Sequence, residues 1–321
     1  MASAPRSVAL MSAWRTGNSP IARAAALLLA LLPAAAAGAP QRVMSLNLCA
    51  DVLALHLLPR ERIVSVSFLA ASSPLSPVRA LAQGLPANDS QIEEIVVARP
   101  DLVLVHRYSD PRVLEWLERL GIGALTVDLP TSVEAALAQW RRVGVALDAE
   151  ARAEALIAKA KQALAGGGPD GLAGPFAAGM RQPSLHGRIH GVSRESVRSD
   201  AMPPLAAVYG TNGTTQGRNS LLDDLLRHAG FRNLASELGL EALATLPLER
   251  LALAQPQMLV LARDSAREQS LADMSLSHPL LRRLARDTAV VELPGRYWSC
   301  GGPELIEALQ RLRGAPVGEA P

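Results

Sequence analysis

The side chains best suited to binding a ligand follow predicted strands, where the chain turns into a loop. They are Asn47, Phe68, His106, Arg107, Tyr108, Tyr209, Thr211, Asn212, Thr214, Arg263, Tyr297 and Trp298. All three tyrosines of the chain are in this set, although aromatic residues make up only 3% of the sequence. Because open parallel sheets bind ligands beyond the carboxyl ends of their strands, we expect these residues to line a cleft.

The chemistry of this set suits a large, flat and anionic ligand. Aromatic faces stack on planar groups such as corrin rings or catechol and hydroxamate chelates, and Arg107 and Arg263 supply positive charge for an anionic chelate. The alternative for any single aromatic residue is that it covers the edge of a core without contacting a ligand.

Histidine residues could instead hold a bare zinc or manganese ion, which needs three or four converging ligands. Only His106 lies in a predicted cleft loop. His186 and His190 have the spacing of a helical pair, but they lie in a Gly-rich segment and lack the intervening Glu of a zinc hydrolase. The other histidines considered lie in or beside predicted helices, at His56, His228 and His278. We predict no metal site and no cofactor, and a metal-ion binding protein is the alternative.

Catalytic signatures do not occur in the sequence. It contains no Gly-x-Ser-x-Gly elbow and no convincing pair of carboxylates. Residues 210–215 are Gly-rich but lack the Lys of a phosphate loop. The formal net charge of +2 argues against a large basic surface for nucleic acid. We therefore predict no enzyme and no nucleic-acid partner; a periplasmic hydrolase is the less favoured alternative.

Short apolar runs alternate with helical patterns, which predicts an α/β fold of two lobes with mainly parallel central sheets. Predicted strands span residues 43–46, 63–66, 102–105 and 124–127, then 205–209, 258–261 and 290–293. Predicted helices span residues 50–57, 92–98 and 113–120, then 221–229, 248–253, 280–286 and 304–312. We expect a ligand cleft between the lobes.

One long helix is predicted between the lobes, because residues 149–164 are rich in Ala, Glu, Lys and Leu and contain no Gly or Pro. The expected organisation is an N-terminal lobe at 40–146, a linker helix at 147–165 and a Gly/Pro-rich loop or insertion at 166–204. A C-terminal lobe at 205–313 and a tail at 314–321 follow.

Residues 1–39 have the layout of a secretory signal peptide. Arg6, Arg15 and Arg23 precede or begin an apolar run at 24–32, and small residues follow at 34–39. The run is shorter than the roughly 20 apolar residues that span a bilayer. We expect cleavage between residues 36 and 39, and a mature protein that is free in the periplasm.

An internal repeat links the two lobes. Residues 93–105 and 249–261 both open with Glu, reach Pro seven positions later and continue into an apolar strand. The simplest explanation is that each lobe reuses one helix–strand module, with Glu93 and Glu249 favoured near a helix start by the helix dipole.

Three motifs resemble the periplasmic binding proteins for ferric siderophores and cobalamin. They are Ser-Leu-Asn-Leu-Cys-Ala-Asp at 45–51, Glu-x-Ile-x-x-x-x-Pro-Asp-Leu-Val at 93–103 and Trp-Ser-Cys-Gly-Gly-Pro at 298–303. The resemblance covers nearly all of residues 41–313 except the insertion. Phe68, Tyr297 and Trp298 match positions where cobalamin binders carry aromatic residues, although the richer Trp set of those proteins is missing.

The resemblance implies a function and partners. It implies two lobes joined by one rigid helix with little hinge motion, and capture of an iron-siderophore-type chelate or a corrinoid. The monomeric binding protein would deliver this ligand to the permease dimer of an ABC importer in the inner membrane. Glu93 and Glu249 match the surface carboxylates that dock onto Arg pockets of the permease; a capping role alone is the alternative.

The two cysteines, Cys49 and Cys300, follow the first strand of one lobe and the last strand of the other. In an oxidising compartment an isolated pair is a candidate disulfide. Two separate buried thiols, or a thiolate pair that contacts a metal, are the alternatives.

Overall fold

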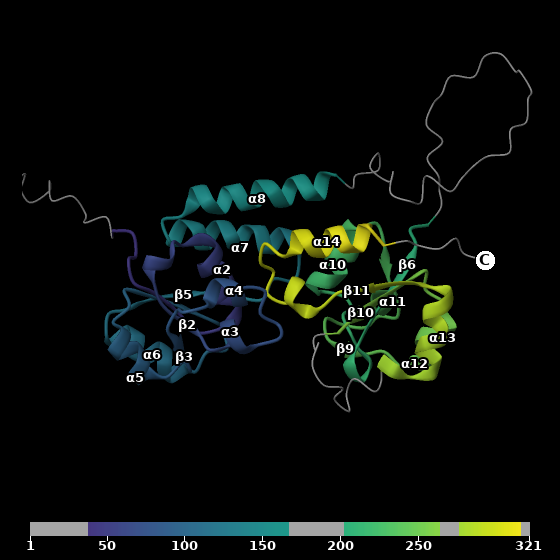
Figure 1. Cartoon of the computed structure of the whole chain (residues 1–321), viewed down its shortest axis with the longest axis horizontal. Coiled ribbons are helices and arrows are strands. Elements are labelled where there is room, and N and C mark those ends of the chain that lie inside the picture. Colours follow the sequence, from purple (N-terminus) through teal and green to yellow (C-terminus); the bar gives the residue numbers. More distant parts are fainter. Residues whose placement is uncertain (1–37, 167–201, 264–275, 316–321) are drawn as a thin grey trace, which may run out of the picture. The chain divides into compact units, whose positions relative to one another are not determined.

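The computed structural model describes residues 38–166, 202–263 and 276–315 (Figure 1). The predicted signal peptide lies almost entirely outside the described residues. So do most of the predicted insertion, with His186 and His190, and most of the C-terminal tail. Within the described ranges, no helix is both long enough and apolar enough to span a bilayer.

The first lobe contains a parallel sheet of five strands in the order β3-β2-β1-β4-β5. Its strands are β1 (Val43–Ser45), β2 (Ile63–Ser67), β3 (Ala87–Asn88), β4 (Leu102–Val105) and β5 (Gly123–Thr126). Its helices are α2 (Leu48–Leu57), α3 (Leu69–Ser72), α4 (Arg79–Ala82), α5 (Ile92–Ala98) and α6 (Pro111–Arg119), with a 3₁₀ turn η1 (Arg60–Arg62). The two-residue strand β3 was not predicted, because so short a segment has no readable periodicity.

Alternate residues of these strands enter two separate cores, as the twofold period of a strand requires. Val43 and Leu104 pack with α2, whereas Met44 and Val103 pack with Ile95 of α5 and with α6. Both faces of the sheet are covered, which explains why its strands read as continuous apolar runs.

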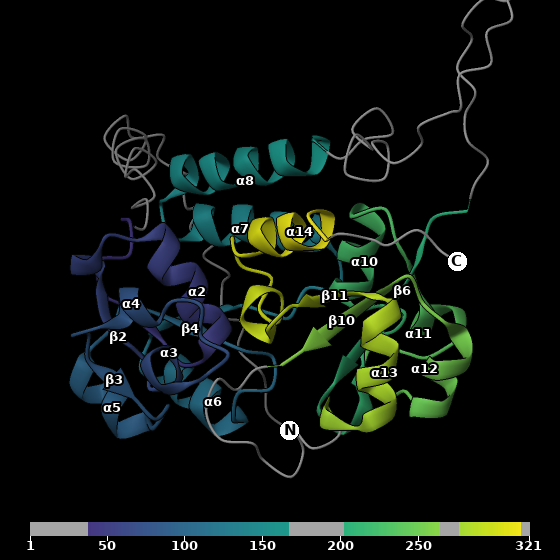
Figure 2. The same cartoon turned by 45° about the vertical axis from the view of Figure 1, so that its right-hand side comes forward.

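The second lobe repeats this plan with a parallel sheet in the order β11-β10-β6-β8 (Figure 2). The strands are β6 (Leu205–Gly210), β8 (Arg232–Asn233), β10 (Met258–Ala262) and β11 (Ala289–Glu292). A separate antiparallel pair joins β7 (Thr214–Thr215) to β9 (Ala244–Thr245). The helical segments are η2 (Thr211–Gly213), α10 (Leu221–His228), α11 (Leu234–Glu237), α12 (Leu248–Ala254), α13 (Pro279–Asp287), η4 (Gly295–Tyr297) and α14 (Leu305–Arg313).

Two helices of the described residues lie between the two sheets in the sequence. The predicted linker is α8 (Glu150–Ala165), and before it lies α7 (Val133–Ala146), which the sequence analysis missed. The helices α7 and α8 pack along each other, and α14 packs on α8, as Figure 1 shows. The close approach of α7 and α8 depends on Gly144, because a Cβ atom there would lie 2.5 Å from the Cβ of Ala153.

Both helices contact both lobes. At the start of α8, the guanidinium of Arg152 donates to Leu57 O of α2 at 3.1 Å, and near the end of α8, Leu164 O accepts from the guanidinium of Arg313 at 3.1 Å. The backbone N–H of Val133, at the start of α7, donates to Asp224 of α10 at 2.7 Å. One apolar core runs through this layer, and it contains residues of both sheets. A continuous core resists hinge bending, because separating the lobes would expose it to water.

The internal repeat is present in three dimensions. Both α5 and α12 have seven residues, both end on a left-handed residue, Arg99 (φ 47°) or Gln255 (φ 44°), and Pro follows each. The next residues form β4 and β10. The prediction that each lobe reuses one helix–strand module is confirmed.

Candidate functional site

The carboxyl edge of the first sheet carries exposed apolar side chains. Phe68 follows β2, Tyr108 follows β4 and Leu129 follows β5, and their exposed fractions are 48%, 81% and 52%. Exposed apolar groups of this size concentrated at one sheet edge are typical of binding surfaces. Leu129 was absent from the predicted set, because an isolated Leu in a loop carries no distinguishing sequence signal.

Polar contacts hold the loop after β4 in place. The rings of His106 and Tyr108 lie 5.1 Å apart, and the backbone N–H of Tyr108 donates to Nδ1 of His106 at 3.2 Å. The guanidinium of Arg107 donates to Asp128 at 2.8 Å, and this hydrogen bond lowers the pKa of the Asp128 carboxyl. The charge of Arg107 at this edge is therefore paired with that of Asp128.

Asn47 lies at the same edge but acts as a helix cap. Its side-chain oxygen accepts from the backbone N–H of Ala50 at the start of α2, and its amide nitrogen is buried without a hydrogen-bond partner. Behind it, Asp51 accepts from the backbone N–H of Ser67 at 2.9 Å and from the Ser67 hydroxyl. Burial raises the pKa of Asp51 to about 6.

The predicted cleft residues of the second lobe have different surroundings. Tyr209 is buried in the core beneath α11 and α12, and burial, with a smaller effect of Glu249, raises its pKa. Asn212 is exposed in a left-handed conformation after β6. Arg263 follows β10 and lies 3.8 Å from Glu292, while Trp298 is half-buried and donates to Leu293 O at 3.4 Å.

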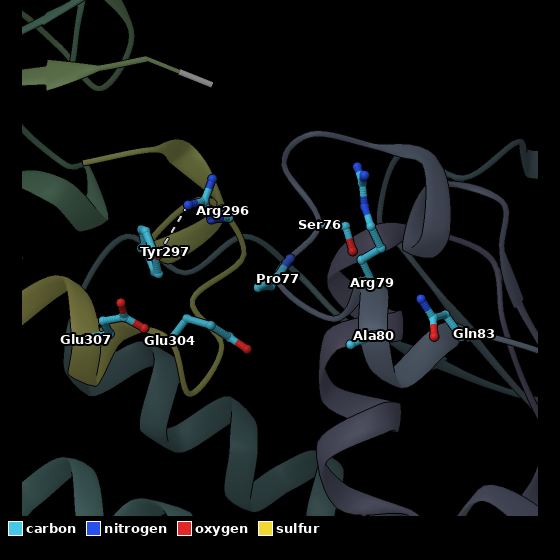
Figure 3. A pocket seen from close by; sticks show the side chains of 9 residues that line it. All are labelled: Ser76, Pro77, Arg79, Ala80, Gln83, Arg296, Tyr297, Glu304 and Glu307. Atoms are coloured by element: carbon cyan, nitrogen blue, oxygen red, sulfur yellow. Dashed lines mark hydrogen bonds between the residues drawn. The ribbon is translucent and has the colours of Figure 1, made fainter. Parts of the chain in front are cut away.

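Tyr297 lines a pocket of about 420 Å³ between the two lobes (Figure 3). One wall consists of Arg296, Tyr297, Glu304 and Glu307, and the other consists of Ser76, Pro77, Arg79, Ala80 and Gln83. The guanidinium groups of Arg296 and Arg311 lie 4.7 and 4.6 Å from the centre of the Tyr297 ring. Tyr297 is thus the only member of the predicted set that lines this pocket, and its ring already carries two cations.

The part of the chain that the structure describes contains no group of three or more His, Cys, Asp or Glu side chains that could hold a metal ion. His56, one of the histidines weighed from the sequence, instead pairs with Glu304 at 2.7 Å. His228 lies 3.7 Å from Asp224, and His278 caps α13.

A disulfide, a hydrogen bond and a close backbone contact join the loop at 298–304 to the rest of the protein. Cys49 and Cys300 form a disulfide, with their Cα atoms 4.9 Å apart. The indole of Trp140 donates to Gly301 O at 2.7 Å. Gly301 has φ of +62° and its Cβ would lie 2.2 Å from Pro130, so this approach requires glycine. The predicted cysteine pair therefore lies at a tightly packed contact between the lobes.

Glu93 and Glu249 are exposed at the starts of α5 and α12. The capping group of α5 is Glu94, which accepts from the backbone N–H groups of Asp89 and Gln91 at 2.9 and 3.0 Å. Among the described residues, no hydrogen bond or ion pair involves the carboxylate of Glu93 or of Glu249. Four residues further along each helix, Val97 and Leu253 are 80% and 82% exposed.

Solved structures share this arrangement of lobes. A periplasmic heme binding protein from Pseudomonas aeruginosa is 25% identical, with a TM-score of 0.60 over 85% of this chain and 91% of that chain. An Fe³⁺-hydroxamate transport protein from Saccharomonospora viridis is 20% identical, with a TM-score of 0.57 over 86% and 92% of the chains. The chain has the class III periplasmic-binding-protein fold.

The same fold occurs in a periplasmic vitamin B12 binding protein from Vibrio cholerae, which is 15% identical, with a TM-score of 0.55 over 85% and 95% of the chains. No protein-family model and no curated protein matches the sequence. These solved structures are of binding and transport proteins and not of enzymes, in agreement with the prediction that this chain is not an enzyme. The predicted α/β fold of two lobes with parallel sheets is confirmed.

Proposed function

We propose that the protein captures an iron chelate or a corrinoid in the periplasm and delivers it to an ABC importer. The observation that carries this proposal is the exposed edge formed by Phe68, Tyr108 and Leu129, on a fold that serves heme, Fe³⁺-hydroxamate and vitamin B12 binding proteins. Exposed aromatic and apolar side chains at the carboxyl edge of a parallel sheet suit a ligand with extended flat faces.

The proposal requires that the ligand contacts both lobes. Asn212, Arg263 and Trp298 follow strands of the second lobe and carry exposed or half-exposed side chains. They would complete the site opposite Phe68 and Tyr108. Trp298 also makes binding measurable, because a ligand close to an indole changes its fluorescence.

Ligand binding is tested by titrating the purified protein with haemin, a ferric hydroxamate, cyanocobalamin, Zn²⁺ and Mn²⁺. We expect one chelate or corrinoid to bind one-to-one at micromolar concentration or below and to change the tryptophan fluorescence. Tyr108→Ala should weaken this binding, whereas Trp116→Ala should not, since Trp116 is an exposed aromatic residue of the helix α6 and not of a loop at the sheet edge. Tight binding of zinc or manganese, with no response to any chelate, would contradict the proposal.

Glu93 and Glu249 are the proposed contacts with the permease. Two exposed carboxylates, one on each lobe, for which the described residues provide no hydrogen-bond or ion-pair partner, can align the protein on a dimer that presents two cationic sites. Changing both to Ala should leave ligand affinity unchanged and abolish uptake in cells. Glu118→Ala is the matched control, because Glu118 is an exposed carboxylate of α6. Weakened ligand binding, or normal uptake, in the double variant would leave helix capping as their role.

The location and assembly are also proposals. A signal peptide at 1–39 predicts a mature N-terminus between residues 37 and 40, which N-terminal sequencing of the periplasmic protein measures. We expect the mature protein to be a monomer by light scattering, and a stable dimer would contradict this.

A further inference from the structure

The pocket between the lobes has charged side chains on both walls, and only some of them already have a partner of opposite charge or a side-chain hydrogen bond. Each carboxylate already has a side-chain partner that does not line the pocket. Glu307 accepts from Arg311 at 2.7 Å, one turn away on α14, and Glu304 pairs with His56 of α2 at 2.7 Å. Both carboxylates are therefore engaged by side chains outside the pocket lining.

The two arginines that line the pocket lack such partners. Within the described ranges, no carboxylate lies at ion-pair distance from Arg79 or from Arg296. Arg79 donates to the backbone oxygens of Ser72 and Ser73 at 3.3 and 2.9 Å. Arg296 donates to the Tyr297 hydroxyl at 3.2 Å and lies over its ring. Hydrogen bonds therefore hold both guanidinium groups in place, but no carboxylate of the described residues neutralises their charge.

The geometry also places these cations on different lobes. Arg79 belongs to α4, and Arg296 belongs to η4 directly after β11, so they occupy opposite walls in Figure 3. A volume of about 420 Å³ is at the small end of ligand pockets and accommodates one end of a large chelate. A guanidinium binds oxyanions strongly because it offers several N–H donors in a plane.

We propose that this pocket binds an anionic oxygen group carried by the captured ligand, with Arg79 and Arg296 as donors from opposite lobes. The ligand class is thereby narrowed to chelates that bear free carboxylates, and the inference rests on the proposed capture of a chelate. The arginine pocket adds a charged subsite to the apolar edge formed by Phe68, Tyr108 and Leu129.

The test compares haemin, which has two free carboxylates, with haemin dimethyl ester, which has none. Dissociation constants are measured by fluorescence for the wild type, Arg79→Gln, Arg296→Gln and the double variant. We expect haemin to bind the wild type more tightly than the ester does. Each substitution should raise the Kd of haemin by about tenfold and leave that of the ester unchanged, since a charged hydrogen bond is removed.

Two controls separate charge from structure. Arg296→Lys keeps the positive charge and should restore most of the affinity for haemin. Arg119→Gln should change neither Kd, although Arg119 also lies over an aromatic ring, that of Trp116, at 5.4 Å.

Several results would overturn the inference. If haemin binds the wild type and the double variant equally, or if the substitutions weaken haemin and ester alike, the pocket has no anion subsite while capture of chelates stands. Binding of a neutral ferric hydroxamate without binding of haemin would likewise show that the pocket has no anion subsite. Arginine-dependent binding of inorganic phosphate that does not weaken haemin binding would assign the pocket to a free anion. If no chelate and no corrinoid binds the wild type, the proposed function itself fails.

Discussion

Replacing both cysteines by serine tests the bridge between the lobes. The disulfide joins residues separated by 251 positions, so the oxidised unfolded chain contains a very large closed loop. In the chain-entropy description, a loop of this size removes about 5 kcal/mol of unfolded-state freedom at 25 °C. Measured losses for native disulfides are commonly about 2–5 kcal/mol. We expect the double variant Cys49→Ser, Cys300→Ser to lose stability within this range.

The effect should act mainly through the unfolded state, because other contacts hold the loop at 298–304 in the folded protein. Trp140 still donates to Gly301 O, and His56 still pairs with Glu304. Ligand affinity and the radius of gyration of the folded protein should therefore change little when the disulfide is absent.

The assay is urea unfolding of the wild type, the reduced wild type and the double variant, followed by tryptophan fluorescence and circular dichroism. Reduction of the wild type should reproduce the loss seen in the double variant. Thiol titration of the unfolded, unreduced periplasmic protein should find no free thiol. Two free thiols, or unchanged stability of the double variant, would refute the bridge and its contribution to joining the lobes.

Three further substitutions test other parts of the fold. Burial raises the pKa of Asp51 to about 6, so the folded protein holds a proton that the unfolded chain releases near pH 4. The free energy of unfolding should therefore fall by about 3 kcal/mol as the pH rises from 4 to 7. Urea titrations of Asp51→Asn should lack this decrease. Gly144→Ala should lower thermal stability, by about 1–3 kcal/mol, because its Cβ would overlap that of Ala153, and an unchanged melting temperature would contradict the close packing of α7 on α8. Trp140→Phe should cost about 1–3 kcal/mol in urea unfolding by leaving the Gly301 carbonyl without its donor, and an equal stability would show that water replaces the indole.

Local patterns predicted the elements that are long or sharply bounded. The helix α5 and the strand β4 lie at the predicted residues, because an apolar helix face, a Pro and a buried run of β-branched and Leu residues follow one another there. The repeat in the second lobe was found for the same reason. The helix α7 was missed because Arg141, Arg142 and Gly144 interrupt its apolar pattern, and only its contacts with α8 and with both lobes explain them.

The sequence by itself determined the type of each lobe and the edge at which a ligand would bind, since apolar periodicity is a local property and strand polarity sets which loops share an edge. The tertiary structure decided which of those loop residues are exposed to a ligand. It buried Tyr209 under α11 and α12, placed two guanidinium groups over Tyr297, and brought Arg79 and Arg296 to one pocket from positions more than 200 residues apart. It also joined Cys49 to Cys300 beside Gly301. These outcomes depend on tertiary packing within and between the lobes, and contacts between distant segments leave no periodic signal in either segment.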